Sequence, residues 1–249
     1  METLIVSRKN DLLKRAKLFH HTKIFSPEAN DYVVGVLHEP DGFKDYQSGK
    51  EPVVEADELY DLDHSSWLTV NHYNALVLNT SNMLIADIDF GDERLDRHAG
   101  AKDWQQVCRN LEELHLLDEE HMWHDFIFKD LTAERFRFAE QSYRVYRTHS
   151  GCRVICTSIA VPWQDKGRRA KRFMQFLRSD RAYIELCGVQ KCYRARLTPK
   201  PWRDKGDGCC VCLHVSTEGK KLHVAPELEE QLKLHDELTL PEHEWAELA

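Results

Sequence analysis

The chain has 249 residues and a formal net charge of −8, and apolar residues make up 42% and charged residues 31% of it. This composition excludes a wholly disordered chain, and the length suffices to bury a core as one large domain. The first apolar run, at residues 4–6, is too short for a signal-peptide core or a membrane span. We therefore expect a cytoplasmic protein without membrane contact.

Little chemistry is visible near the N-terminus. Residues 11–19 have the spacing of a short amphipathic helix, residues 31–37 form a β-branched run typical of a strand, and residues 39–49 have the composition of a loop. We expect residues 1–72 to be flanking elements that pack on a core.

The sharpest local feature is a pair of carboxylates at the end of an apolar run. Residues 73–79 and 83–90 predict two strands around a turn, and the second is apolar up to Asp87 and Asp89. Residues i and i+2 of a strand point to the same face, so both carboxylates can converge on Mg²⁺ or Mn²⁺. The competing interpretation is an Asp-rich turn, in which one Asp caps a helix and the other is solvated.

A hairpin follows two predicted helices, at 101–117 and 131–139. Residues 142–148 and 152–157 alternate with period two around a small-residue turn. Arg147, His149, Ser150 and Arg153 surround that turn and offer a hydroxyl and cations, as a triphosphate pocket requires. An ordinary exposed hairpin tip would look similar.

Basic residues are concentrated in one block. Residues 143–205 contain 16 Lys and Arg against 4 Asp and Glu, inside an otherwise acidic chain. The block includes a basic helix predicted at 168–177 and a strand at 193–198, which carries Arg194 and Arg196 and is followed by Lys200. Such a block indicates a phosphate-bearing partner, because Arg suits bidentate phosphate contact. Pairing of these arginines with the acidic remainder is the alternative.

The eight cysteines are expected to be reduced thiols or metal ligands. Cys187, Cys192, Cys209 and Cys212 could supply four ligands to zinc. A further strand is predicted at 210–216, however, and burial of small thiols in such a strand would give the same pattern.

Three of these stretches together resemble the archaeo-eukaryotic primase superfamily, the primase-polymerase group. Residues 84–89 match its first acidic motif, residues 148–153 its Ser-x-His-type hairpin, and Asp180 with residues 193–200 its third motif. Cys152 stands two residues after Ser150, where the family pattern has His. The resemblance implies that Asp87, Asp89 and Asp180 are catalytic metal-binding residues, and that Ser150, Arg196 and Lys200 hold the incoming nucleotide.

The order of the predicted elements favours an α+β fold with two layers, a mainly antiparallel or mixed sheet and helices on one face. The resemblance adds that this core is RRM-like. We expect residues 73–215 to form the nucleotide-binding core and residues 216–249 an acidic, helix-prone tail. The predicted function is metal-dependent nucleotidyl transfer, with nucleotides and DNA or RNA as partners. The alternatives are a non-catalytic module that binds single-stranded nucleic acid through residues 143–205, and a protein whose basic block docks an acidic partner.

Overall fold

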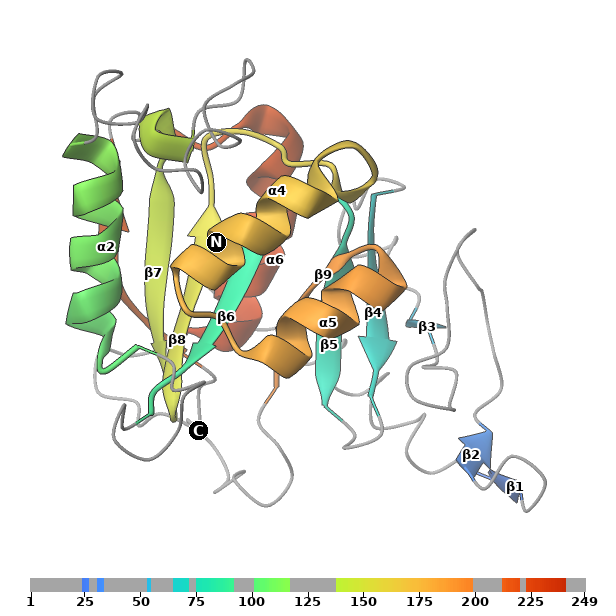
Figure 1. Ribbon diagram of the computed structural model, residues 1–249. Helices are drawn as coiled ribbons and strands as arrows, with labels where there is room; N and C mark the ends of the chain where they lie inside the picture. Colours follow the sequence, from blue (N-terminus) through green and yellow to red (C-terminus); the bar gives the residue numbers. More distant parts are fainter. Residues whose placement is uncertain are drawn as a thin grey trace. The chain divides into compact units, whose positions relative to one another are not determined.

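The computed structural model describes residues 24–26, 31–33, 53–54, 65–71, 75–91, 101–116, 138–198, 212–219 and 223–240 (Figure 1). The chain divides into two compact units, each assembled from segments far apart in sequence. Unit 1 comprises Met1–Thr80, Arg194–Val211 and Glu230–Ala249, and unit 2 comprises Ser81–Tyr193 and Cys212–Glu229. No helix in these described stretches is long and apolar enough to cross a membrane.

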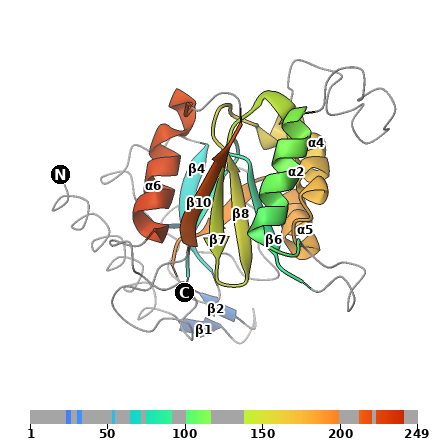
Figure 2. The same ribbon diagram turned by 90° about the vertical axis from the view of Figure 1, so that its left-hand side faces the viewer.

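Unit 2 is built on a four-stranded antiparallel sheet in the order β10-β7-β8-β6. Its strands are β6 (Ile85–Asp89), β7 (Tyr143–Thr148), β8 (Gly151–Cys156) and β10 (Cys212–Glu218). Its helices are α2 (Trp104–Leu116), α4 (Trp163–Phe176) and α5 (Arg181–Gln190), with 3₁₀ turns η2 (Phe138–Glu140) and η4 (Pro226–Leu228). Figure 2 shows α2, α4 and α5 on the same side of the sheet. The unit therefore has a helical layer on one face of a sheet.

Alternation along the strands decides which side chains lie under those helices. On β6, Ala86 and Ile88 are buried, and Ala86 pairs with Val154 of β8. Tyr143 of β7 lies on the same face by its register, and its ring stacks on Phe173 of α4 with centroids 5.2 Å apart. The helix-covered face thus takes every second residue of β6, β7 and β8, and the residues between them point to the other face.

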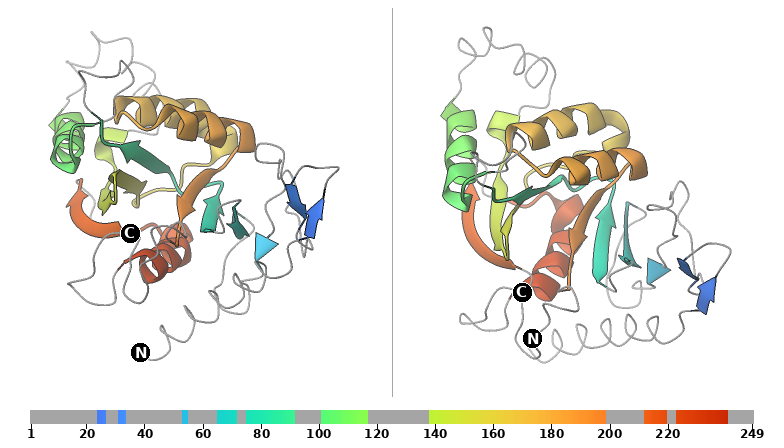
Figure 3. Two further views of the ribbon diagram at one scale, coloured as in Figure 1. Left: turned by 90° about the horizontal axis from the view of Figure 1, so that it is seen from below. Right: turned by 60° about the horizontal axis from the view of Figure 1, so that its bottom comes forward.

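Local signals set the ends of α5. The Asp180 side chain accepts a hydrogen bond from the backbone N–H of Tyr183 at 2.9 Å, which is the N-cap contact of the helix. The helix ends where Lys191 adopts the left-handed conformation with φ of 60°. Figure 3 shows α4 and α5 side by side.

Unit 1 contains a two-stranded antiparallel pair and a second four-stranded sheet in the order β3-β4-β5-β9. The pair consists of β1 (Ile24–Ser26) and β2 (Asp31–Val33), and the sheet of β3 (Val53–Val54), β4 (Ser66–Val70), β5 (Leu76–Thr80) and β9 (Tyr193–Arg196). The helix α6 (Glu229–Thr239) buries Leu232, Leu234 and Leu238. Its Gln231 accepts a hydrogen bond from the Thr80 hydroxyl at 3.0 Å, which ties α6 to β5.

The α+β class expected from the sequence is confirmed, with helices and antiparallel sheets. Strands β5 to β10 and helix α2 appear close to where the sequence predicts them. In contrast, β4 and α5 have no counterpart among the predicted elements, and α4 begins at Trp163 instead of residue 168. The helix predicted at 11–19 and most of the one at 131–139 lie outside the described residues, as does part of the strand at 31–37. The RRM-like character of the core stays a prediction.

The two compact units do not follow the boundaries of the expected segments. Residues 73–215, expected as one core, contribute to both units, and residues 1–72 belong to unit 1. Residues 216–249, expected as an acidic and helix-prone tail, contain the end of β10 and the helix α6, which buries three leucines. The compact units are therefore discontinuous in sequence.

Candidate functional site

Asp87 and Asp89 lie on the face of β6 that points away from α2, α4 and α5. Their neighbours Ala86 and Ile88 are buried on the helix-covered face, so alternation places both carboxylates on the other one. The Asp87 side chain is 34% exposed and Asp89 is exposed. The strand thus presents the two carboxylates together, as predicted for an Asp-x-Asp pair in a strand.

Arg153 of β8 lies directly across from Asp87 in the sheet. Hydrogen bonds from Cys156 N–H to the Leu84 carbonyl and from Phe90 N–H to the Ser150 carbonyl fix the pattern of this ladder. Asp87 and Arg153 therefore form a non-hydrogen-bonded pair, the kind in which the side chains approach most closely. The Arg153 Nε lies 3.3 Å from the Asp87 Oδ1.

This ion pair joins a buried group to a partly exposed one. The Arg153 side chain is only 3% exposed, against 34% for Asp87. Burial lowers the pKa of the Arg153 guanidinium. The Asp87 carboxylate and Cys212 raise this pKa, and the net shift is upward. Arg153 thus remains charged in the protein interior, where it forms an ion pair with the Asp87 carboxylate.

The row that begins with Asp87 and Arg153 continues across the whole sheet. Tyr146 of β7 pairs with Arg153, and His214 of β10 pairs with Tyr146. The Tyr146 and His214 rings meet edge to face with centroids 5.4 Å apart, Tyr146 being buried and His214 exposed. Neither residue is among the candidate site residues predicted from the sequence. Period-two alternation predicts the strands that contain them. It does not predict the pairing of β10 with β7, which brings the two rings together.

The hairpin tip lies beside the end of β6. The Ser150 carbonyl accepts the hydrogen bond from the Phe90 N–H at 2.9 Å, and Gly151 pairs with Asp89. A Cβ atom on Gly151 would overlap the Ile88 carbonyl oxygen, so only glycine allows this close approach of the two strands. The first two motifs of the resemblance therefore meet in space, and His149 and Ser150 are exposed there.

Arg147 and Cys152 face the other way. They pair with each other across β7 and β8, one residue out of step with the pair of Tyr146 and Arg153. Arg147 is exposed, whereas Cys152 is buried, and its burial together with the Asp87 carboxylate raises the pKa of the Cys152 thiol. Arg147 is thus separated from the Asp87 face, and the cation that faces Asp87 is Arg153.

Asp180 comes next to Asp87 through its backbone. Its N–H donates to the Asp87 carbonyl at 3.0 Å, on the edge of β6 that β8 does not use. Its carboxylate meanwhile caps α5 by accepting from Tyr183, whose hydroxyl donates to the Ile85 carbonyl at 3.0 Å. The start of α5 therefore covers the edge of β6, and the Asp180 carboxylate has a structural role there.

The remaining predicted residues are distributed over other parts of the chain. Arg194 is buried and Arg196 is half-buried in β9 of unit 1, and Lys200 lies outside the described residues. Of the four possible zinc ligands, Cys187, Cys192 and Cys212 are buried and Cys209 is not among the described residues. Within the parts of the chain that are described, no group of three or more His, Cys, Asp or Glu is arranged to hold a metal ion.

The carboxylate pair could nevertheless hold a magnesium or manganese ion if bound phosphates supplied further ligands. Such ions are commonly held by one or two protein carboxylates, with substrate phosphates and water completing the coordination shell. Asp87 and Asp89 offer hard oxygen ligands on one face, and the exposure of Asp89 leaves room for approach.

Comparison of the chain with protein-family models, curated proteins and solved structures finds no significant match.

Proposed function

We propose that this protein binds a nucleoside triphosphate together with Mg²⁺ or Mn²⁺ at Asp87 and Asp89, and that it catalyses nucleotidyl transfer. The observation that carries the proposal is the meeting of these two carboxylates with the hairpin tip of Ser150 and Gly151 on one end of the sheet. The resemblance to the primase-polymerase group, based on the same stretches, adds support from the sequence.

The residues around the pair have complementary roles in this proposal. Asp87 and Asp89 would hold the metal ion, which would neutralise phosphate charge and hold the reacting oxygens in line. Arg153 keeps a fixed positive charge beside Asp87 and holds that carboxylate in place. His149 and the hydroxyl of Ser150 are exposed at the tip, where they can contact phosphate oxygens. The phosphate contacts expected of Arg194, Arg196 and Lys200 stay a prediction from the sequence.

The test uses Asp89→Asn in the full chain, because Asp89 is exposed and its replacement leaves the pair of Asp87 and Arg153 intact. Nucleotide affinity is measured calorimetrically with Mn²⁺ and with excess chelator. We expect metal-dependent affinity to fall by at least about tenfold, because the loss of a residue that merely supports a metal ligand typically costs that much. The denaturation midpoint, measured in parallel, reports whether the variant folds as the parent does.

A matched control is Glu113→Gln, which removes an exposed carboxylate from α2 of the same unit. This variant should bind nucleotide as the parent does. Extension of a labelled primer, run in parallel, reports on transfer itself. Equal metal-dependent affinity and turnover in the parent and Asp89→Asn would refute the proposal.

The ion pair supports a second candidate function. Because Arg153 already neutralises Asp87, the site can persist without a metal ion and serve a protein that only binds single-stranded nucleic acid. That function predicts binding that weakens with salt and is indifferent to chelator. The chelator arm of the same titrations, repeated with an oligonucleotide, separates the two candidates.

A further inference from the structure

Helix α4 has a strongly basic side opposite its buried side. Its buried residues recur every three or four positions and face the sheet layer: Trp163, Gly167, Ala170, Phe173 and Met174. Over the same 14 residues the helix carries one acidic residue, Asp165, and five basic ones: Lys166, Arg168, Arg169, Lys171 and Arg172. The hydrophobic pattern fixes the orientation of α4, so that Arg168 and Arg172 turn away from the sheet.

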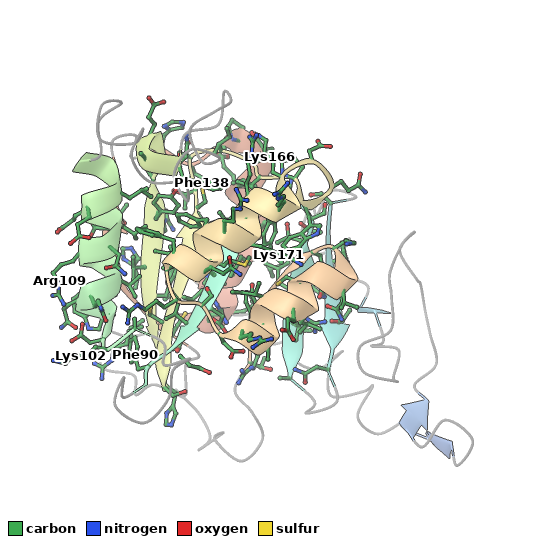
Figure 4. All side chains as sticks on the ribbon, viewed as in Figure 1. Phe90, Lys102, Arg109, Phe138, Lys166 and Lys171 are labelled. Atoms are coloured by element: carbon green, nitrogen blue, oxygen red, sulfur yellow. The ribbon has the colours of Figure 1, made fainter. Side chains whose placement is uncertain are left out.

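Arg168 and Arg172 form the centre of this basic side. At 3.6 residues per turn both lie about 160° around the helix axis from the buried Ala170. Arg168 is exposed and Arg172 is half-buried. Lys171 lies on the flank that faces α5, and Figure 4 marks it on the helix.

Helix α5 extends the basic surface through a small-residue contact. A Cβ atom on Gly188 would overlap the Nζ of Lys171, so the glycine leaves room for this ammonium group beside α5. Beyond Gly188, Lys191 is exposed at the end of the helix. We call Arg168, Lys171, Arg172 and Lys191 the α4–α5 basic surface.

Like charges lie close together on this surface. Arg168 and Arg172 are four residues apart, and Arg168 and Lys171 are three apart, so like charges are neighbours on the helix surface. Each such pair is unfavourable by about 0.2–0.5 kcal/mol in an isolated helix. A bound polyanion would offset this repulsion, and arginine is well suited to phosphate groups.

The α4–α5 basic surface is separated from the candidate site by the sheet of unit 2. α4 packs on the face that contains Tyr143, whereas Asp87 and Asp89 lie on the opposite face. A ligand on α4 therefore does not compete for the carboxylates. The chemistry also differs, because the four residues that define this surface are basic, whereas the candidate site is built on two carboxylates.

From these observations we infer that the α4–α5 basic surface binds the sugar-phosphate backbone of a nucleic acid, at a second site independent of Asp87 and Asp89. A membrane surface is less suitable, since interfacial helices present large apolar side chains beside the charges. Val189, on α5, is the only large apolar residue strongly exposed in the described part of the chain. The site needs neither metal nor nucleotide, and it reads backbone charge instead of base sequence.

The test compares two double variants of the full chain with equal change in charge. Arg168→Glu with Arg172→Glu alters the α4–α5 basic surface, and Lys102→Glu with Arg109→Glu alters exposed cations at α2, marked in Figure 4. Binding of a labelled 20-nucleotide strand and a 20-base-pair duplex is followed by fluorescence anisotropy in chelator at several salt concentrations. We expect the first variant to bind at least about tenfold more weakly than the parent, and the control to stay within about threefold of it. In the first variant the slope of log affinity against log salt concentration should also become shallower, by the amount that about two phosphate contacts contribute.

Further arms separate the possible failures. Equal losses in the two variants, or none in either, would overturn the inference, and so would displacement of the oligonucleotide by polyglutamate at equal charge. Binding to phosphatidylserine vesicles that depends on Arg168 and Arg172, without oligonucleotide binding, would assign the surface to membranes instead. Arg168→Gln with Arg172→Gln provides a milder variant if the first does not fold.

The outcome is also distinguishable from that of the proposed function. The Asp89→Asn variant should keep the chelator-resistant oligonucleotide affinity of the parent. The Arg168→Glu, Arg172→Glu variant should keep Mn²⁺-dependent nucleotide affinity within about twofold. Loss of both activities in either variant would contradict the independence of the two sites.

Discussion

At the scale of single residues, the site depends on an asymmetric ion pair. The Arg153 side chain is almost fully buried, while Asp87 keeps about a third of its side-chain surface exposed. Removing Asp87 takes a carboxylate away from a guanidinium in the protein interior, which is costly. Removing Arg153 leaves a carboxylate that can be hydrated through its exposed side. The two members of the pair should therefore contribute unequally to stability.

We accordingly expect Asp87→Asn to lower the free energy of unfolding by about 3 kcal/mol, the lower end of the range for breaking a buried pair. Arg153→Met should cost less. The double variant should be more stable than Asp87→Asn alone, because the buried charge is gone. Guanidinium denaturation in the presence of chelator measures all three. Additive effects of the two substitutions would mean that the pair contributes no coupling energy.

The expected loss of stability makes Asp87→Asn unsuitable as a simple test of metal binding. The sequence alone suggests that this variant would test metal binding with the fold intact. The structure adds a stability cost, so Asp89→Asn is the cleaner variant. Period-two alternation was enough to predict that Asp87 and Asp89 share a face. It could not predict the pairing with Arg153, because 66 residues separate the partners and only the register of β6 with β8 brings them together.

At the scale of elements, α5 shows why part of the site could not be predicted. Its buried positions include Gly188 and Gln190 as well as Ile184 and Cys187, so its sequence lacks a continuous apolar stripe. The sequence does not predict this helix, and the role of Asp180 as a third metal carboxylate rests on the resemblance alone. The structure instead gives its carboxylate a cap contact with Tyr183. Tertiary packing, more than periodicity, determines this element.

A substitution can separate the capping role of Asp180 from a metal-binding role. Serine caps helices about as well as aspartate but is not a carboxylate ligand. We expect Asp180→Ser to keep both the stability and the Mn²⁺-dependent nucleotide affinity of the parent, and Asp180→Ala to lose about 1 kcal/mol of stability. Thermal denaturation and nucleotide titration provide the two measurements. A stable Asp180→Ser variant with weakened metal-dependent binding would show that the carboxylate does bind the metal.

At the scale of the molecule, buried thiols and phenols make the free energy of unfolding depend on pH in the alkaline range. Burial raises the pKa of Cys108 from 9.0 to about 11 and that of Cys156 from 9.0 to about 12. Burial also raises the pKa of Tyr143 and Tyr193 well above 10.0. Each of these groups is neutral in the native state and ionises more readily once the chain unfolds.

The sign of the effect follows from proton linkage. Below pH 9 the thiols are protonated in both states, and their contribution to stability is complete. Between pH 9 and about 11 the unfolded chain releases protons that the native chain retains, so stability falls as pH rises, by up to about 1.4 kcal/mol per pH unit for each thiol. Denaturation series at pH 8, 9 and 10 measure this slope, and Cys156→Ala should make it shallower. An identical slope in that variant would exclude the Cys156 thiol as a source.

The two units also bear on how the chain forms during synthesis. The sheet of unit 2 is completed by β10, which follows β8 by more than fifty residues, and α6 of unit 1 follows later still. As a chain leaves the ribosome from its N-terminal end, β6 and its two carboxylates emerge well before their sheet can close. Neither unit can then fold as an early intermediate while the other is being made. Each unit closes only after its last segment has been made, and its apolar strands stay exposed in the growing chain until then.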